Sequence, residues 1–160
     1  MNEYSTSIRR ARLADLERLS ALWMAMMEEQ AELDLRFALA PGARKRWIAY
    51  VRGELRRGSA LCLVAEENGI PVGYLLATVH DHPALYAPEP YGFISDCYVV
   101  RRLRRQGVGR RLVEQAQEWF RKRGLRVFQL YIAEANLAAI SFWEAIGGSP
   151  FMRRYWFRVG

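Results

Sequence analysis

Apolar residues recur at helical spacing over two stretches near the start of the chain. The first predicted helix opens at Asp15, and its apolar face consists of Leu16, Leu19, Trp23, Met26 and Met27. The second follows Pro41-Gly42 and ends before Gly58, with an inner face formed by Trp47, Tyr50, Val51 and Leu55. A short strand, residues 8–12, is predicted ahead of both helices.

The pattern in the middle of the chain predicts strands. Two apolar runs, residues 60–66 and 70–79, flank Asn68-Gly69, which predicts a tight hairpin because both turn positions need positive φ. A loop through residues 80–90 leads to a third strand, residues 92–100.

The last third alternates helices and strands. An amphipathic helix stops at Gly124 and has an apolar face of Val108, Leu112, Val113, Ala116, Trp119 and Phe120. A strand (127–132), a helix from Asn136 to Gly147 and a final strand (151–159) follow.

The order β-α-α-β-β-β-α-β-α-β predicts an α/β fold, a mixed β-sheet with helices on both faces. The strands 92–100 and 127–132 are joined by a crossover helix, so we expect them to be parallel. No repeat or linker interrupts the pattern, and residues 1–160 are therefore interpreted as a single domain.

Composition fits a soluble globular chain. Of 160 residues, 51% are hydrophobic and 26% are charged. No window reaches the roughly 18 apolar residues of a membrane span, and the first residues lack the layout of a secretion signal, so we expect no membrane and a cytoplasmic location. Cys62 and Cys97 lie in apolar runs, which favours buried reduced thiols.

The charge is unevenly distributed. The net charge is +7, and all but two of the 24 basic residues are arginines. One short stretch contains Arg101, Arg102, Arg104, Arg105, Arg110 and Arg111. Arginine recognises phosphate with a fork of fixed donors, although a solvated basic surface would give the same count.

The segment Arg104-Arg105-Gln106-Gly107-Val108-Gly109-Arg110 joins a predicted strand to a predicted helix. Its glycines let the backbone approach a ligand, and the helix start offers unpaired N–H groups, so the turn suits a pyrophosphate. A tight turn without a ligand remains the alternative for Gly107. No Lys-Ser/Thr pair of a P-loop follows, and Leu112 occupies the third glycine position of a dinucleotide fingerprint.

The stretch Ile94-Ser95-Asp96-Cys97-Tyr98-Val99-Val100, followed by this turn, resembles the central motif of the GNAT superfamily of N-acetyltransferases. A second family signature is matched by Asn136, Ala139, Phe142, Trp143, Glu144 and Gly147. The order of predicted elements is also similar to that of the family over nearly the whole chain.

The resemblance implies that acetyl-CoA, as co-substrate, binds where the two parallel strands splay apart. Backbone N–H groups of the turn would hold the pyrophosphate, and the strand end would pair with the pantetheine arm. The cofactor-binding residues so implied are Cys97, Tyr98, Val99, Arg104, Arg105, Gln106, Gly107, Val108, Gly109, Arg110, Asn136, Ala139 and Trp143.

Amide formation from a thioester needs a base and a donor for the oxyanion. Asp96 interrupts an apolar strand and matches an acidic position of many family members, so it is the candidate base; a structural Asp paired with an arginine is the alternative. A backbone N–H near Val99 is the candidate oxyanion donor. Trp143 stands where many members place a tyrosine acid, and indole cannot replace it.

The acceptor site is less well marked. The acidic run Glu28, Glu29, Glu32 and Asp34 lies where family members often line the acceptor pocket, although such a run is also typical of a solvated face. We take Glu28, Glu32, Asp34 and Tyr86 as candidate substrate-binding residues. His80-x-His82 lacks a third metal ligand nearby, so no metal is expected.

The sequence therefore predicts an N-acetyltransferase that acts on a primary amine of a small molecule or peptide by direct attack. The alternatives are a non-catalytic acyl-CoA-binding module, favoured by Trp143, and an Arg-rich nucleic-acid binder, which would show steeply salt-dependent affinity. The apolar run 151–159 would also allow two copies of the chain to pair as a homodimer.

Overall fold

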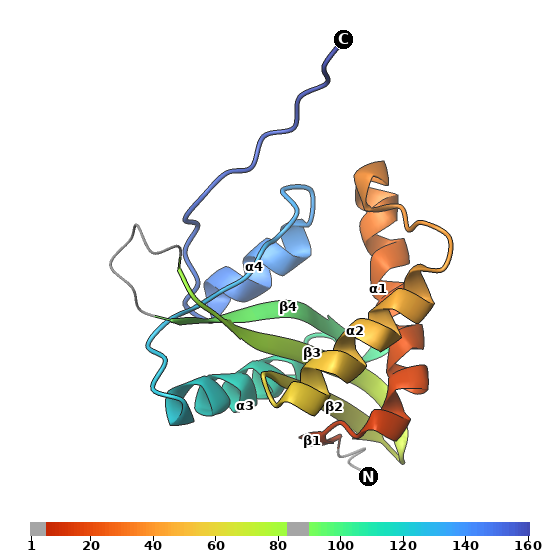
Figure 1. The fold of residues 1–160 in the computed structure, drawn as a ribbon, viewed down its shortest axis with the longest axis vertical. Coiled ribbons are helices and arrows are strands. Elements are labelled where there is room, and N and C mark those ends of the chain that lie inside the picture. Colours follow the sequence, from red (N-terminus) through yellow and green to blue (C-terminus); the bar gives the residue numbers. More distant parts are fainter. Residues whose placement is uncertain (1–5, 83–89) are drawn as a thin grey trace.

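The computed structural model describes residues 6–82 and 90–160. One five-stranded sheet lies at its centre, in the order β1-β2-β3-β4-β5 (Figure 1). The strands are β1 (Ser7–Arg10), β2 (Ala60–Glu67), β3 (Ile70–His80), β4 (Tyr91–Val99) and β5 (Phe128–Gln129). Neighbours are antiparallel except β4 and β5, whose parallel pairing confirms the predicted crossover.

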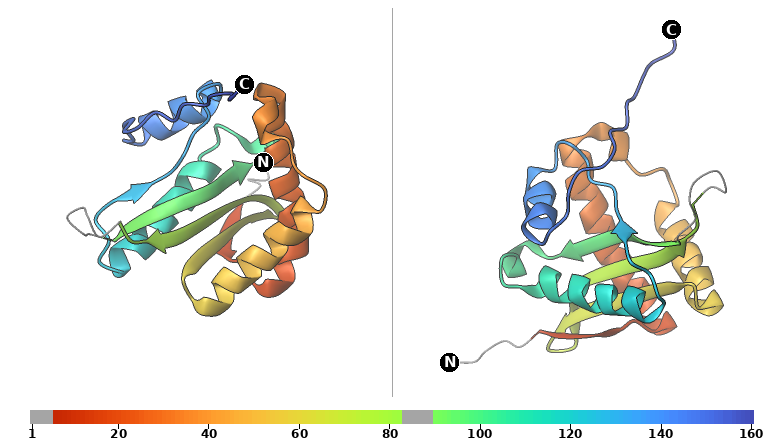
Figure 2. Two further views of the ribbon diagram at one scale, coloured as in Figure 1. Left: turned by 45° about the horizontal axis from the view of Figure 1, so that its top comes forward. Right: turned by 90° about the vertical axis from the view of Figure 1, so that its left-hand side faces the viewer.

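Helices cover both faces of this sheet (Figure 2). Helices α1 (Leu16–Leu33) and α2 (Ala43–Arg57) lie on one face, and α3 (Val108–Lys122) lies on the other. A fourth helix, α4 (Leu137–Ala145), packs beside the start of α3. Three short 3-10 turns complete the path: η1 (Leu13–Asp15), η2 (Leu35–Phe37) and η3 (Arg101–Leu103).

The sheet separates two apolar cores. On one side, Trp47 of α2 stacks on Trp23 of α1, with ring centroids 5.6 Å apart, and meets Tyr74 of β3 edge-on. On the other side, Leu112 and Trp119 are among the α3 residues buried against β2, β3 and β4. The amphipathic patterns of the sequence thus place their apolar faces against the sheet.

Local signals in the sequence are confirmed at two turns. Asn68 and Gly69 have φ of 52° and 74°, as the predicted hairpin requires. Gly58 has φ of 71° and ends α2. Cys62 is buried, Cys97 is half-buried, and both thiols are free. Within the described ranges, no helix is both long and apolar enough to cross a membrane.

Two predicted strands differ from the structure. The expected strand 127–132 shortens to two residues because the chain diverges from β4 after Gln129. The predicted strand 151–159 is wrong for this chain: the segment lies outside the sheet, and its side chains are exposed. An alternating pattern becomes a strand only beside a partner that accepts its hydrogen bonds. Tyr86 and most of the predicted 80–90 loop lie outside the described residues.

Candidate active site

The sheet opens along one edge of β4. Pairing with β5 is limited to Gly92 with Phe128 and Phe93 with Gln129. Beyond Phe93, no described strand lies against this edge of β4, whereas the opposite edge continues to pair with β3 as far as Val99. The edge from residue 94 to residue 99 is therefore available to an extended ligand.

β4 contains one extra residue just beyond the point where its pairing with β5 ends. Ile94 pairs with Ala77 and Asp96 pairs with Leu76, so Ser95 has no opposite residue in β3. Such a bulge bends a strand and redirects its side chains. Here Ile94 packs in the core under α3, while Asp96 faces α2 on the other side of the sheet.

Backbone groups at the end of β4 point into this opening. Val100 donates its backbone hydrogen bond to Val72 of β3 over 2.9 Å. Because main-chain groups alternate sides along a strand, the N–H groups of Val99 and Cys97 point away from β3. The carbonyl oxygen of Val99 accepts a hydrogen bond from Arg104 Nε over 2.8 Å.

The predicted phosphate turn begins α3. Gly107 has φ of 81° and no side chain caps the helix, and Arg105 also has positive φ, at 64°. The first backbone hydrogen bond of the helix runs from Arg111 N to Gly107 O, so the preceding N–H groups have no helical acceptor. A Cβ on Gly107 would meet nothing within 4 Å, so the turn is open to solvent. An anion fits such a helix start.

The arginines around the turn fall into two groups. Arg101 and Arg104 bind Glu29 of α1, and Arg102 binds Glu67 of β2. Arg111 donates to the backbone and side chain of Thr6. By contrast, Arg105 and Arg110 make no ion pair with any described residue and remain available to an anionic ligand.

Asp96 lies beneath α2 and has an unusual environment. Trp47 Nε1 donates a hydrogen bond to its Oδ2 over 3.2 Å. Burial raises the pKa of Asp96 to about 6, and the Trp47 indole and the nearby Tyr74 hydroxyl offset part of that rise. A carboxylate with such a pKa can accept a proton near neutral pH.

Glu29 ties α1 to the end of β4. Its carboxylate accepts hydrogen bonds from the Tyr98 hydroxyl (2.9 Å) and from Arg104 Nη2 (2.8 Å). Although burial raises the pKa of Glu29, hydrogen bonds from Arg104, Tyr98 and Arg101 lower it below its usual value. Tyr98 pairs with Tyr74 of β3 and packs under α1, so neither its backbone nor its ring faces the gap.

Helix α4 forms the other side of the opening. Asn136 caps it, because its carboxamide oxygen accepts a hydrogen bond from Ala139 N over 3.0 Å. Phe142 reaches toward Gly109, where a Cβ would lie 3.4 Å from the ring. Trp143 is half-buried, and its ring meets that of Phe142 edge-on, with the ring centroids 5.1 Å apart. Gly109 therefore lets α4 pack closely against α3, in addition to its place in the phosphate turn.

The acidic candidates for the acceptor site are dispersed. Asp34 caps η2 and binds Arg36, and Arg36 lowers the pKa of Asp34 to about 2. Glu32 lies 3.5 Å from Arg101, and Glu28 is exposed. Within the parts of the chain that the structure describes, no group of three or more His, Cys, Asp or Glu could hold a metal ion.

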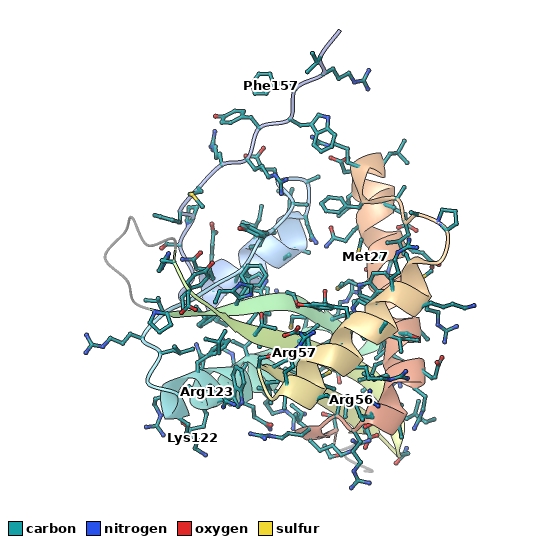
Figure 3. The ribbon with its side chains drawn as sticks, viewed as in Figure 1. Met27, Arg56, Arg57, Lys122, Arg123 and Phe157 are labelled. Carbon is teal, nitrogen blue, oxygen red and sulfur yellow. The ribbon has the colours of Figure 1, made fainter. Side chains whose placement is uncertain are left out.

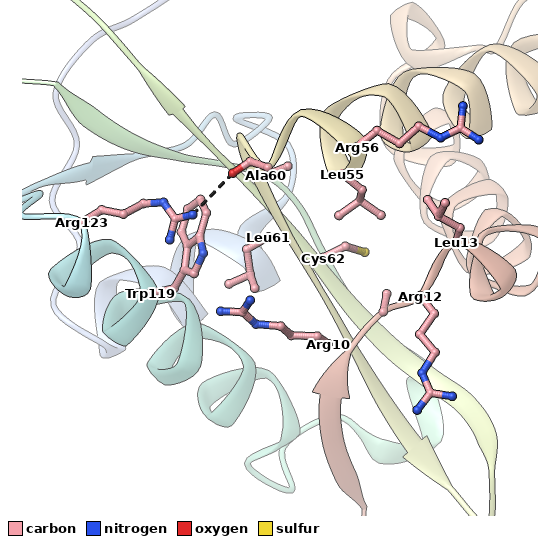
Figure 4. Close-up of a pocket in the computed structure, with 12 residues that line it drawn as sticks. Arg10, Arg12, Leu13, Leu55, Arg56, Ala60, Leu61, Cys62, Trp119 and Arg123 are labelled. Atoms are coloured by element: carbon pink, nitrogen blue, oxygen red, sulfur yellow. Dashed lines mark hydrogen bonds between the residues drawn. The ribbon is translucent and has the colours of Figure 1, made fainter.

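A separate hollow of about 400 Å³ lies between β2, the end of α2 and the end of α3 (Figure 4). The guanidinium carbon of Arg123 lies 3.9 Å from the centroid of the Trp119 ring. Arg10 also points toward that indole, whereas Arg12 and Arg56 point away (Figure 4). The hollow adjoins Arg123, just past the end of α3, while Gly107 begins that helix. It therefore does not belong to the phosphate turn.

Sequence comparison assigns the family. The Acetyltransferase (GNAT) family matches residues 17–147, so the chain belongs to this family. An uncharacterized N-acetyltransferase of Methanocaldococcus jannaschii is 29% identical over 65% of this chain and 46% of its own length. An aminoglycoside N(6')-acetyltransferase type 1 of Klebsiella aerogenes is 31% identical over 61% of the chain and 64% of its own length. The matches thus span less than two thirds of these two relatives.

Solved structures share the fold. A GCN5-related N-acetyltransferase of Ralstonia eutropha is similar with a TM-score of 0.78 and 24% identity, over 98% of this chain and 100% of that one. The aminoglycoside N-acetyltransferase AAC(6')-Iy in complex with CoA is similar with a TM-score of 0.76 and 19% identity, over 99% of this chain and 97% of that one.

Two parts of the site escape sequence reasoning. The helical spacing of Trp47 indicates a core position, which it occupies, but not its hydrogen bond to Asp96, 49 positions away in the chain. Glu29 belongs to the acidic run, and only the fold shows that it faces the arginines of the turn.

Proposed function

We propose that this chain is an N-acetyltransferase that moves an acetyl group from acetyl-CoA to a primary amine by direct attack. One arrangement supports it: the half-buried Asp96, the open edge of β4 and the uncapped start of α3 follow one another over residues 96–110. Family membership and relatives named as N-acetyltransferases point the same way.

The turn offers what a diphosphate requires. Unpaired N–H groups at Val108, Gly109 and Arg110 and the positive end of the α3 dipole favour an anion. Arg105 and Arg110 add charge-assisted hydrogen bonds, for which the structure shows no competing acid among the described residues. Two solved relatives carry CoA or acetyl-CoA, which fits this assignment.

The open edge of β4 would hold the pantetheine arm as an added strand. The N–H groups of Val99 and Cys97 face that arm and would donate to its carbonyl oxygens, among them the thioester oxygen. Asn136, Ala139 and Trp143 would line the opposite side, at the start of α4 and along it. Fixed donors of this kind typically lower the barrier by about 3 kcal/mol each.

Asp96 would take the proton that the acceptor amine loses. Above a pH of about 6 the carboxylate is ionised, and the Trp47 indole holds one of its oxygens in place. The departing thiolate would be protonated by solvent, because the indole of Trp143 is no acid. An alkyl thiol is far more acidic than an alcohol (the pKa of cysteine is about 8.5), which makes the CoA thiolate a tolerable leaving group.

The acceptor is proposed to be a cationic amine of a small molecule or peptide. Glu28 and Glu32 of α1 are exposed and negatively charged near the end of the helix that contacts Tyr98. Asp34 is held by Arg36 and contributes only after that pair opens. Aminoglycosides are the first compounds to try, because a relative and several solved neighbours are named for them.

Calorimetry with two matched variants tests the cofactor half. Gly107 and Gly42 both precede a helix with φ near +80°, so Gly107→Glu and Gly42→Glu introduce the same charge and similar strain. We expect Gly107→Glu to lose CoA binding, while Gly42→Glu binds as the wild type does. Equal affinities, or no CoA binding by the wild type, would refute the proposal.

Turnover separates an enzyme from a binding module. Release of free thiol is followed with acetyl-CoA and a panel of amines that includes aminoglycosides, polyamines and peptide N-termini. Thiol release that depends on one class of amine supports the enzyme. Tight CoA binding without turnover on any amine would favour a non-catalytic acyl-CoA-binding module.

A further inference from the structure

Helix α1 is joined to the end of β4 by a single carboxylate, that of Glu29. The half of α1 that carries Met27 lies beside the end of β4 (Figure 3). The side chain of Glu29 is 24% exposed. It accepts hydrogen bonds from the Tyr98 hydroxyl and from Arg104 Nη2, and Arg101 Nε lies 3.2 Å from its Oε1. Glu29 therefore links the helix both to the strand and to the segment that leads into the phosphate turn.

Arg104 makes two hydrogen bonds with one guanidinium. Its Nε donates to the Val99 carbonyl oxygen and its Nη2 donates to Glu29, both over 2.8 Å. Its guanidinium carbon also lies 5.4 Å from the centroid of the Tyr98 ring. Because the guanidinium is planar and rigid, the two bonds fix the Val99 carbonyl relative to Glu29. A side chain of α1 thus holds the backbone of β4 through one intermediate residue.

Val99 lies where the sheet itself gives little support. Beyond Phe93, no described strand lies beside this edge of β4. The N–H and carbonyl groups of one residue lie on the same side of a strand, so both groups of Val99 face the open edge. Arg104 donates to the carbonyl in place of a neighbouring strand. On the other edge, Val100 is held by its hydrogen bond to Val72.

We propose that Glu29 is a positioning residue for acyl transfer: through Arg104 it fixes Val99, whose N–H would donate to the thioester oxygen. The inference rests on the proposed function, which assigns that donor. The Arg104 side chain is engaged within the chain, whereas Arg105 and Arg110 make no ion pair with any described residue. A fixed donor stabilises an oxyanion without reorganising during the reaction, and a small displacement removes much of that benefit.

Glu67 provides a matched control for the loss of charge. It is also a largely buried carboxylate, and it binds Arg102, an arginine of the same stretch, over 2.6 Å. Among the described residues, no hydrogen bond joins the Arg102 side chain to the backbone of β4. Glu29→Ala and Glu67→Ala therefore each remove a carboxylate that binds an arginine ahead of the turn, but only Glu29→Ala releases the end of β4.

Kinetics of these variants supply the first test. We expect Glu29→Ala to lower kcat about 10- to 100-fold. Its affinity for CoA, measured by calorimetry, should be at least that of the wild type, because an acid near an anion site opposes binding. Glu67→Ala should keep the wild-type kcat.

Glu29→Gln keeps one oxygen as an acceptor, so it should lose less activity, and it replaces Glu29→Ala if that variant does not fold. Three results would overturn the proposal: a wild-type kcat in the folded Glu29 variants, an equal fall of kcat in Glu67→Ala, or a loss of CoA affinity that parallels the loss of kcat.

Arg104→Lys tests whether Glu29 acts through Arg104. A lysine ammonium is a single nitrogen on a flexible stem and does not reproduce two separated donors. We expect Arg104→Lys to lower kcat as Glu29→Ala does. The double variant should lose little more than either single variant, because both changes break the same chain of contacts. Losses that multiply in the double variant would show that the two residues act independently and would refute the proposal.

Amide hydrogen exchange tests the hold on β4 without CoA or an amine. The Val100 N–H, bonded to Val72, should exchange at least about tenfold faster in Glu29→Ala than in the wild type, and at the wild-type rate in Glu67→Ala. Unchanged exchange in Glu29→Ala would refute the positioning role. Faster exchange in a protein whose wild type turns over no amine would instead refute the proposed acetyl transfer.

Discussion

Two aspartates at different places around the same sheet have opposite electrostatic surroundings. Asp15, near the β1 edge, lies 2.8 Å from Arg9 Nη1, and hydrogen bonds from Arg9 lower its pKa to about 2. Asp96, on β4, accepts a hydrogen bond from the Trp47 indole, and burial raises its pKa to about 6.

The difference between them is the partner. A guanidinium fixes the charge of Asp15, which also accepts a hydrogen bond from Arg12 N over 2.6 Å and so shapes the entry to α1. No arginine among the described residues reaches Asp96, although the chain has 24 basic residues. The first carboxylate is a structural anchor, whereas the second has a pKa at which a carboxyl group can exchange a proton near neutral pH.

The largest expected effect tests that second role. Asp96→Asn keeps an oxygen that can accept from Trp47 but removes the base. We expect kcat to fall by about 10²–10⁴ with unchanged CoA affinity. When the rate of thiol release is plotted against pH, the variant should also lack the rise near pH 6. An unchanged rate and pH profile would remove Asp96 from the mechanism.

Deletion of Ser95 tests the bulge. Without Ser95, Ile94 and Asp96 become consecutive residues opposite Ala77 and Leu76, so the pairing of β4 with β3 is regular. Ile94 and Asp96 keep the faces of the sheet on which they now lie. We expect a folded protein whose kcat falls about 100-fold, because the gap beside β4 narrows. Denaturation monitors the fold and thiol release the rate. A deletion variant with full activity would show that the bulge plays no part.

The fold followed from local signals to a large extent. Helical periodicity located α1 to α3, the capping residue Asn136 located α4, Asn68-Gly69 located the hairpin, and the glycine turn located the start of α3. The features that were missed depend on distant parts of the chain. The Ser95 bulge has no signature in neighbouring residues, and the alternation of 151–159 does not reveal whether a partner strand exists.

Removal of Arg9 tests the anchor. Arg9→Met leaves Asp15 and Glu66 without their shared cation, which should destabilise the fold by about 1–2 kcal/mol at neutral pH, because the partly exposed guanidinium is screened by solvent. The folded pKa of Asp15 is depressed, so its stabilisation is present above about pH 4 and is lost as the pH falls toward 2. Urea unfolding should therefore show the deficit shrinking at low pH. A deficit independent of pH would mean that lost packing, not charge, explains it.

Asp96 should show the reverse dependence on pH. Its folded pKa of about 6 exceeds the usual 3.8, so the stability that it contributes is present below about pH 4 and is lost as the pH rises through 6. Asp96→Asn is uncharged throughout, and at pH 8 it should be more stable than the wild type by up to about 3 kcal/mol. At pH 4 the two should unfold at similar urea concentrations. Because Arg9→Met loses stability at the pH where Asp96→Asn gains it, measuring both variants at pH 4 and pH 8 tests the contrast directly. Parallel stability curves for the wild type and Asp96→Asn would mean that Asp96 titrates normally.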